Sequence, residues 1–190
     1  EIYNYRELRR ELEARGHRFR SDSDTEVVVH LYEEEGVAAA GRLNGMFAFG
    51  LWDEKKRRLW LCRDRIGIKP LVYSWDGGRL LFASEIRTLL TDPSVDRALD
   101  REALMLYLAF NYVPAPRTMF NGIRKLEPGC SLVLEGGRVE ISRYWGLPDP
   151  AEEAEPADPA RLRSRLVELV SDSVAGCMLA DVPVGAFLSG

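Results

Sequence analysis

Apolar residues recur at helical spacing near the start of the chain. Tyr5, Leu8 and Leu12 are three or four residues apart, which places them on one face of a predicted helix. Gly16 follows at a position where a helix commonly ends. We predict an α-β-α order for the first third of the chain as a whole.

A second helix is predicted from its start and stop signals. Ser23 and Glu26 form the S-x-x-E pattern of a capping box, in which the serine caps the helix and the glutamate bonds back to it. Gly36 marks the expected end. The apolar stripe between these signals predicts a buried face that consists of Val27, Val28, Leu31 and Tyr32.

From residue 46 onward the apolar period changes to two, which is typical of strands. Three hairpins are predicted, each with a polar or glycine-rich turn. They comprise residues 46–53 and 58–64 around the turn 54–57, residues 71–75 and 79–83 around 76–78, and residues 131–145 around 136–137. Because these strands are apolar on both faces, we expect sheets that are covered on each side. Between the second and third hairpins we predict two short helices, capped by Ser84 and Asp100.

The composition changes near residue 148. Residues 148–159 are rich in proline, alanine and acidic residues and lack apolar periodicity, as interdomain linkers do. Beyond them we predict an apolar strand over residues 182–188, preceded by a helix with an apolar stripe at Leu162, Leu166, Leu169, Val170 and Val174. We therefore expect an α+β domain over residues 1–147, a linker over 148–159, and the beginning of a second, α/β-type domain over 160–190.

Composition and charge narrow the class of protein. Hydrophobic residues make up 46% and charged residues 29% of the 190 residues, so a sizeable core can form. The net charge is −4 and no stripe of Lys and Arg runs along the chain, which argues against nucleic acid or a membrane surface as partner. No apolar run approaches the roughly 20 residues of a transmembrane helix.

The cysteines and histidines predict neither a metal site nor a disulfide framework. Cys62, Cys130 and Cys177 are odd in number and far apart, and His17 and His30 lie near none of them in the sequence. We expect reduced thiols with a packing role, as is usual in the cytosol, and no metal ligands.

Three stretches could carry chemistry. Asp24 is in the first turn of a predicted helix, where a carboxylate either only stabilises the helix dipole or binds a ligand. Arg63, Asp64 and Arg65 alternate in charge at the end of a strand, which fits a structural ion-pair corner. The final Ser189–Gly190 either form a simple turn or open a phosphate-binding loop.

Taken together, several motifs resemble one protein family. The stretches EIYNYRELRRELEARGHRF, SDTE, LNGMFAFGLWDEKKRRLWLCRDRIGIKPL, FASEIRTLL and DVPVGAFLSG are similar, in order and spacing, to the glutamine-hydrolysing asparagine synthetases. RDRxGxKPL and FASE are shared more widely among class II glutamine amidotransferases, whereas their combination with PVGxxLSG is more specific. The likeness covers nearly the whole chain, and the linker is its least similar part.

This resemblance implies a two-domain enzyme. The first domain would be an N-terminal-nucleophile hydrolase, an αββα sandwich that is incomplete here and that hydrolyses glutamine to glutamate and ammonia. The first helix and strand of an α/β ATP-pyrophosphatase domain would follow. There ATP and Mg²⁺ would activate aspartate as an acyl-adenylate, and ammonia would displace AMP to give asparagine. The resemblance also implies a cytoplasmic protein without nucleic-acid or membrane partners, and it allows a homodimer.

The resemblance gives roles only to residues that match its motifs. Glu1 and Asp24 match the pair that binds the α-ammonium group of substrate glutamine. Arg63-Asp64-Arg65 match a structural support behind that pocket. The start of the ATP-binding loop is matched by Leu188, Ser189 and Gly190. No cysteine matches the family's N-terminal nucleophile, so we expect a fragment that contains no catalytic residue and hydrolyses no glutamine by itself.

Two alternatives stay open at this point. A relative with the same architecture could amidate another acceptor, such as a sugar, a cell-wall or peptide intermediate, or close a β-lactam ring, because the acceptor pocket would lie beyond Gly190. A module that kept the fold but lost the nucleophile would bind or regulate instead of catalysing.

Overall fold

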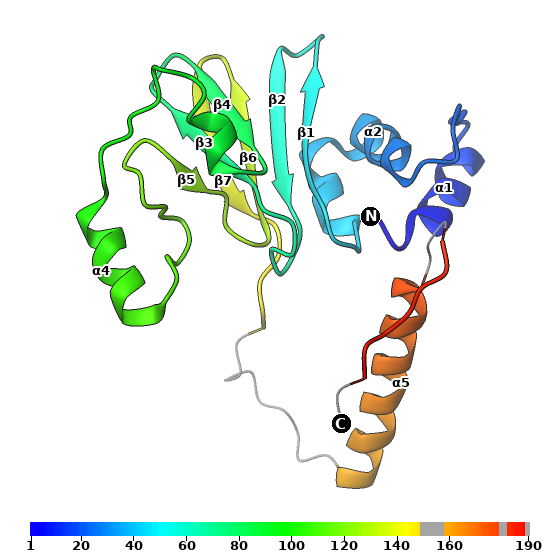
Figure 1. Ribbon diagram of the computed structural model, residues 1–190. Helices are drawn as coiled ribbons and strands as arrows, with labels where there is room; N and C mark the ends of the chain where they lie inside the picture. The colour runs from blue at the N-terminus through cyan, green and yellow to red at the C-terminus, as the bar shows by residue number, and fades with distance from the viewer. Residues whose placement is uncertain (149–157, 179–181, 189–190) are drawn as a thin grey trace.

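The computed structural model describes residues 1–148, 158–178 and 182–188, and its first 145 residues contain two antiparallel sheets (Figure 1). The four-stranded sheet has the order β1-β2-β6-β7 and the three-stranded sheet the order β4-β3-β5. Their bounds are β1 Ala48–Asp53, β2 Arg58–Arg63, β3 Val72–Trp75, β4 Leu80–Ala83, β5 Arg124–Lys125, β6 Cys130–Glu135 and β7 Arg138–Arg143. The three predicted hairpins are confirmed as β1–β2, β3–β4 and β6–β7.

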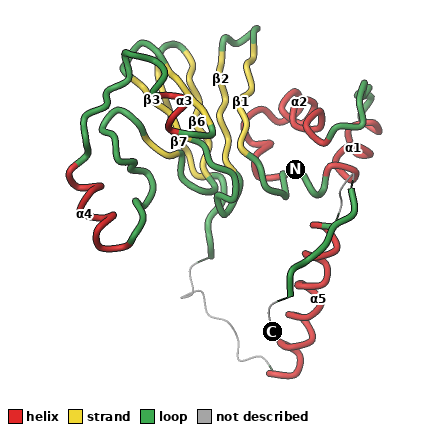
Figure 2. Tube along the Cα trace, in the orientation of Figure 1, coloured by secondary structure: helices red, strands yellow, loops and turns green. Residues whose placement is uncertain are grey.

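Helices flank the sheets and also occupy the C-terminal part (Figures 1 and 2). Their bounds are α1 Tyr5–Ala14, α2 Asp24–Glu35, the 3₁₀ helix η1 Gly36–Arg42, α3 Ile86–Leu89, α4 Arg101–Phe110 and α5 Pro159–Cys177. Each helix predicted from apolar spacing is therefore present. The connection between α1 and α2 contains no strand, so the expected α-β-α order is wrong in its middle element.

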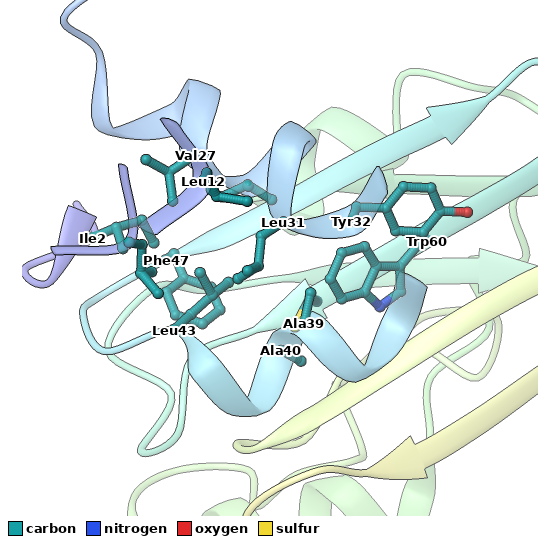
Figure 3. Packing of buried hydrophobic residues seen from close by; sticks show 13 residues of the cluster. Ile2, Leu12, Val27, Leu31, Tyr32, Ala39, Ala40, Leu43, Phe47 and Trp60 are labelled. Atoms are coloured by element: carbon teal, nitrogen blue, oxygen red, sulfur yellow. The ribbon is translucent and has the colours of Figure 1, made fainter. Parts of the chain in front are cut away.

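The buried residues form three clusters, and side-chain alternation along β2 separates the first two. Trp60 and Cys62 face the helices α1 and α2, whereas Leu61 faces the three-stranded sheet. Figure 3 shows Trp60 against Tyr32 of α2, and their ring centroids are 5.5 Å apart. A third cluster joins β3 to the short helix α3 through Val72 and Leu89. The layer order is thus helix, sheet, sheet, helix, as expected, with a thin last layer.

Helix caps agree with the predicted ones in two cases of three. The Ser23 side chain accepts a hydrogen bond from the Thr25 amide, and Asp100 caps α4. Ser84 does not cap α3, because Glu85 holds the N-cap position without a side-chain bond. The capping box at α2 is half formed, since the Glu26 carboxylate bonds to the preceding connection, 20–21, instead of to Ser23.

The C-terminal part departs from expectation in one element. The helix α5 forms, but residues 182–188 are exposed and adopt no strand (Figure 2). A strand needs a neighbour that accepts and donates its backbone hydrogen bonds, and no described strand pairs with this segment. The predicted linker falls almost entirely on residues 149–157, which lie outside the described residues. No helix among the described residues is long and apolar enough to cross a membrane.

Candidate functional site

A groove of about 1110 Å³ runs between α2 and β1, an edge strand of the four-stranded sheet. The first residues of the chain, α2 and β1 all contribute to its lining. Most lining side chains are apolar or aromatic, with carboxylates and lysines interspersed, which is the usual character of a small-molecule site. The lining includes Glu1, Asp24, Val28, Tyr32, Phe49, Trp52 and Lys69.

The two predicted glutamine-binding residues come together in this groove. Asp24 is the first residue of α2, and its Oδ2 accepts a hydrogen bond of 2.7 Å from the amide of Ile2. The main-chain nitrogen of Glu1 lies 3.9 Å from the same oxygen. Ile2 is buried in the core against α1 and α2, so this contact fixes the first residues of the chain against the start of α2. Two carboxylates 23 residues apart thus line one groove.

A second contact holds Glu1 from the side of the sheet. Its nitrogen donates to the carbonyl of Met46 at 2.7 Å, and its carbonyl accepts from the Met46 amide at 3.0 Å. Gly45 makes this pairing possible, because a Cβ there would lie 2.1 Å from the Glu1 carbonyl oxygen. Gly45 is therefore a positioning residue of the site. Sequence reasoning missed it, although the Asn44-Gly45 pair stands just before the change of period.

The corner after β2 is structural, as predicted, but ion pairs do not build it. Asp64 is fully buried, and its two carboxylate oxygens accept from the amides of Ile68 and Lys69, each at 2.9 Å. No ion pair involves Asp64 among the described residues. Backbone donors take the place of the expected cation because the chain turns tightly around the carboxylate. This turn places Lys69 and Pro70 in the lining of the groove.

Arg63 ties the same corner to the rest of the sandwich. Its guanidinium donates to three main-chain carbonyls, those of Gly67, Lys69 and Leu126, at 2.7–2.8 Å. Burial lowers the pKa of Arg63 from its ordinary value, but an arginine remains charged at any physiological pH. Gly67 has a φ of +74°, which glycine adopts without strain.

None of the three cysteines lines the groove. Cys62 and Cys130 are buried in the sandwich, and burial raises the pKa of both thiols. A thiol with a raised pKa is a poor nucleophile, because the thiolate is the reactive form. Cys177 is exposed at the end of α5. The packing role expected of the cysteines holds for the first two and is wrong for Cys177.

The predicted ATP-binding residues are not placed in a site. Leu188 is 98% exposed, and Ser189 and Gly190 lie outside the described residues. The described segment 182–188 is exposed and contains no helix or strand, so the ATP-binding role of these residues stays a prediction.

The sequence model of the glutamine amidotransferase domain matches residues 1–145. The chain belongs to this family. Over its whole length it is 39% identical to asparagine synthetase [glutamine-hydrolyzing] 3 and 40% identical to asparagine synthetase [glutamine-hydrolyzing] 1, both of Bacillus subtilis. It is 41% identical to a putative glutamine-hydrolysing asparagine synthetase of Mycobacterium tuberculosis. The chain spans 31%, 30% and 30% of the lengths of these relatives.

A solved structure supports the fold of this amidotransferase domain. The glutamine phosphoribosylpyrophosphate amidotransferase of B. subtilis superimposes with a TM-score of 0.51 at 24% identity, over 76% of this chain and 27% of that one. The predicted αββα sandwich fold is therefore confirmed, as is the resemblance to the glutamine-hydrolysing asparagine synthetases.

Proposed function

We propose that this amidotransferase domain binds glutamine in the groove between α2 and β1 and hydrolyses it to glutamate and ammonia within a larger asparagine synthetase. The observation that carries the proposal is the convergence of Glu1 and Asp24 on one groove of a domain from this family. The printed names of the relatives, which are glutamine-hydrolysing asparagine synthetases, support the same function.

In this proposal the two carboxylates bind the α-ammonium group of glutamine. A cation held between two anionic oxygens makes charge-assisted hydrogen bonds, which are about twice as strong as neutral ones. The remaining length of the apolar groove then receives the side chain, and its amide points away from the charged end. The substrate is thereby oriented by its charge before any bond breaks.

The nucleophile belongs, in this proposal, to a residue other than the three cysteines of this chain. Cys62 and Cys130 are buried in the sandwich, and none of the three cysteines is among the residues that line the groove. We expect the 190-residue chain alone to release no ammonia from glutamine.

The proposal for the larger protein adds the second half of the reaction. Aspartate would be the acceptor and ATP with Mg²⁺ the activating reagent, in a cytoplasmic protein that forms homodimers. Leu188, Ser189 and Gly190 would open the ATP loop.

The test is an assay of the full-length protein with aspartate, ATP, Mg²⁺ and glutamine. The proposal predicts glutamate and asparagine in equal amounts. If glutamate formed without asparagine, the glutaminase activity would be supported and aspartate would be excluded as the acceptor. No glutamate under any condition would reject the proposal and favour a binding or regulatory module.

A further inference from the structure

The only two histidines of the chain lie side by side where the segment after α1 packs against α2. His17 follows α1 and His30 lies on α2, and their Nδ1 atoms are 3.1 Å apart. Both side chains are largely buried, with 14% and 16% of their surface exposed. The Phe19 ring packs edge-on against His30 at 4.5 Å between centroids, which fixes one side of the pair.

A carboxylate completes a triangle with these two nitrogen atoms. Glu33 Oε2 lies 3.0 Å from His30 Nδ1 and 3.5 Å from His17 Nδ1. The three edges of the triangle are therefore 3.1, 3.0 and 3.5 Å. Two ligands bound at about 2.0–2.1 Å to a tetrahedral ion lie about 3.3 Å apart. The triangle thus has the size of one face of a tetrahedral coordination shell.

The far side of each imidazole also faces a carboxylate. Glu34 Oε1 lies 2.9 Å from His17 Nε2, and Glu26 Oε1 lies 3.5 Å from the buried His30 Nε2. The hydrogen bond to His17 is the largest cause of a lowered pKa of Glu34. Bonds from Ser21 and from the Arg20 amide lower the pKa of Glu26 to about 2. His17 Nε2 is thus within hydrogen-bond distance of a carboxylate, whereas the buried His30 Nε2 has no hydrogen-bond partner among the described residues.

In the tautomer that carries its proton on Nε2, each neutral imidazole presents the lone pair of Nδ1 to the triangle. Carboxylates behind metal-binding histidines are the usual outer-shell partners that fix the imidazole in this way.

We propose that His17 Nδ1, His30 Nδ1 and Glu33 form a binding site for a divalent transition-metal ion of the Zn²⁺ class. Neutral imidazoles with one carboxylate suit this class, and a water can take the fourth position because the Glu33 side chain is 57% exposed. The ion would fasten the connection after α1 to α2, directly before Ser23 and Asp24. This proposal departs from the expectation of no metal ligands, which rested on sequence spacing, because the two histidines are 13 residues apart in the sequence.

The first test uses the unaltered imidazoles. The 190-residue chain with the substitution Cys177→Ser, which removes its one exposed thiol, is labelled with ¹⁵N and titrated with ZnCl₂. Only two imidazoles contribute signals, so both Nδ1 resonances are expected to shift at one equivalent of Zn²⁺ while both Nε2 atoms keep their protons. Unshifted Nδ1 resonances would overturn the proposal and leave a shared proton between the rings.

The second test compares variants in the same background by Zn²⁺ competition with a chromogenic chelator. Three substitutions each remove one proposed ligand and are expected to weaken Zn²⁺ binding at least 100-fold: His30→Asn, His17→Gln and Glu33→Gln. The substitution Glu34→Gln removes a carboxylate behind a ligand and is expected to weaken binding about 10-fold or more. Glu7→Gln, on the exposed face of α1, is the matched control and should change nothing. Zn²⁺ affinity that His30→Asn and His17→Gln both leave unchanged would overturn the proposal.

Discussion

The helix α1 in the sandwich of residues 1–145 and the helix α5 have the same kind of apolar spacing, but only α1 buries its apolar side chains. Leu12 of α1 is 1% exposed, whereas Leu166 of α5 is 61% exposed. Both leucines lie on the apolar stripe of an amphipathic helix. In the sandwich the stripe of α1 packs against α2, while no described element covers the stripe of α5. Spacing therefore predicts the helix and its apolar face, but burial depends on a partner.

Strands depend on a partner even more than helices do. Residues 58–64 and residues 182–188 are both largely apolar segments for which the sequence predicts strands. The first forms β2, which is hydrogen-bonded to β1 on one side and β6 on the other. The second forms no strand, because a lone extended segment leaves its backbone groups to water. A helix can form from its own hydrogen bonds, and a strand cannot.

The largest effect expected from this difference is on stability. Leu12→Ala should lower the free energy of unfolding by about 2–5 kcal/mol, because it opens a cavity under α1 and α2. Leu166→Ala, the same change on an exposed stripe, should cost less than about 0.5 kcal/mol. Urea unfolding followed by circular dichroism measures both. Equal losses would contradict the description of α5 as an uncovered helix.

A buried and an exposed carboxylate of the sandwich, those of Asp64 and Asp76, can be compared in the same way. Asp64→Ala leaves two main-chain donors without their acceptor and should cost about 2–6 kcal/mol, since each orphaned donor costs about 1–3 kcal/mol. Asp76 also accepts from two amides, those of Gly78 and Arg79, but in an exposed turn. Asp76→Ala should cost no more than about 1.5 kcal/mol, because water replaces the lost bonds. If urea midpoints fell equally in both variants, burial would not explain the corner.

A smaller effect is expected in the dependence of stability on pH. Hydrogen bonds from Ser21 and from the Arg20 amide lower the pKa of Glu26 from 4.5 to about 2 in the folded protein. A lowered carboxyl pKa stabilises the fold above the unfolded value, and this contribution is lost as the pH falls from about 4.5 to about 2. Glu26→Gln should therefore flatten the loss of thermal stability over this range. Glu168→Gln, on the exposed α5, is the control. If the slope of thermal stability against pH changed in this control and not in Glu26→Gln, the lowered pKa of Glu26 would not be its cause.

Local signals predicted most of the fold. The three hairpins and the helices α1, α2, α4 and α5 follow from periodicity and from turn and cap residues, all of which act within about ten residues of chain. The resemblance predicted that Glu1 and Asp24 act together. Local spacing could not, because their approach depends on a hydrogen bond between Ile2 and Asp24 and on the missing side chain of Gly45.

The same limit explains the histidine pair and the Asp64 corner. His17 and His30 meet only because α1 and α2 pack together. The acceptors of Arg63 include the carbonyl of Leu126, which is 63 residues away. Alternating charge at this corner suggested ion pairs, whereas the fold supplies main-chain partners that sequence spacing does not show.

The central claim is that Glu1 and Asp24 bind the α-ammonium group of glutamine. It is tested most directly in the full-length protein by the ratio of kcat/KM for glutamine to kcat/KM for glutaramate, which lacks that group. Asp24→Asn should reduce this ratio about tenfold or more, because a charged hydrogen bond contributes about 1.5–3 kcal/mol. Asp22→Asn, a fully exposed neighbour, is the control and should leave the ratio unchanged. A ratio that Asp24→Asn does not alter would contradict the account.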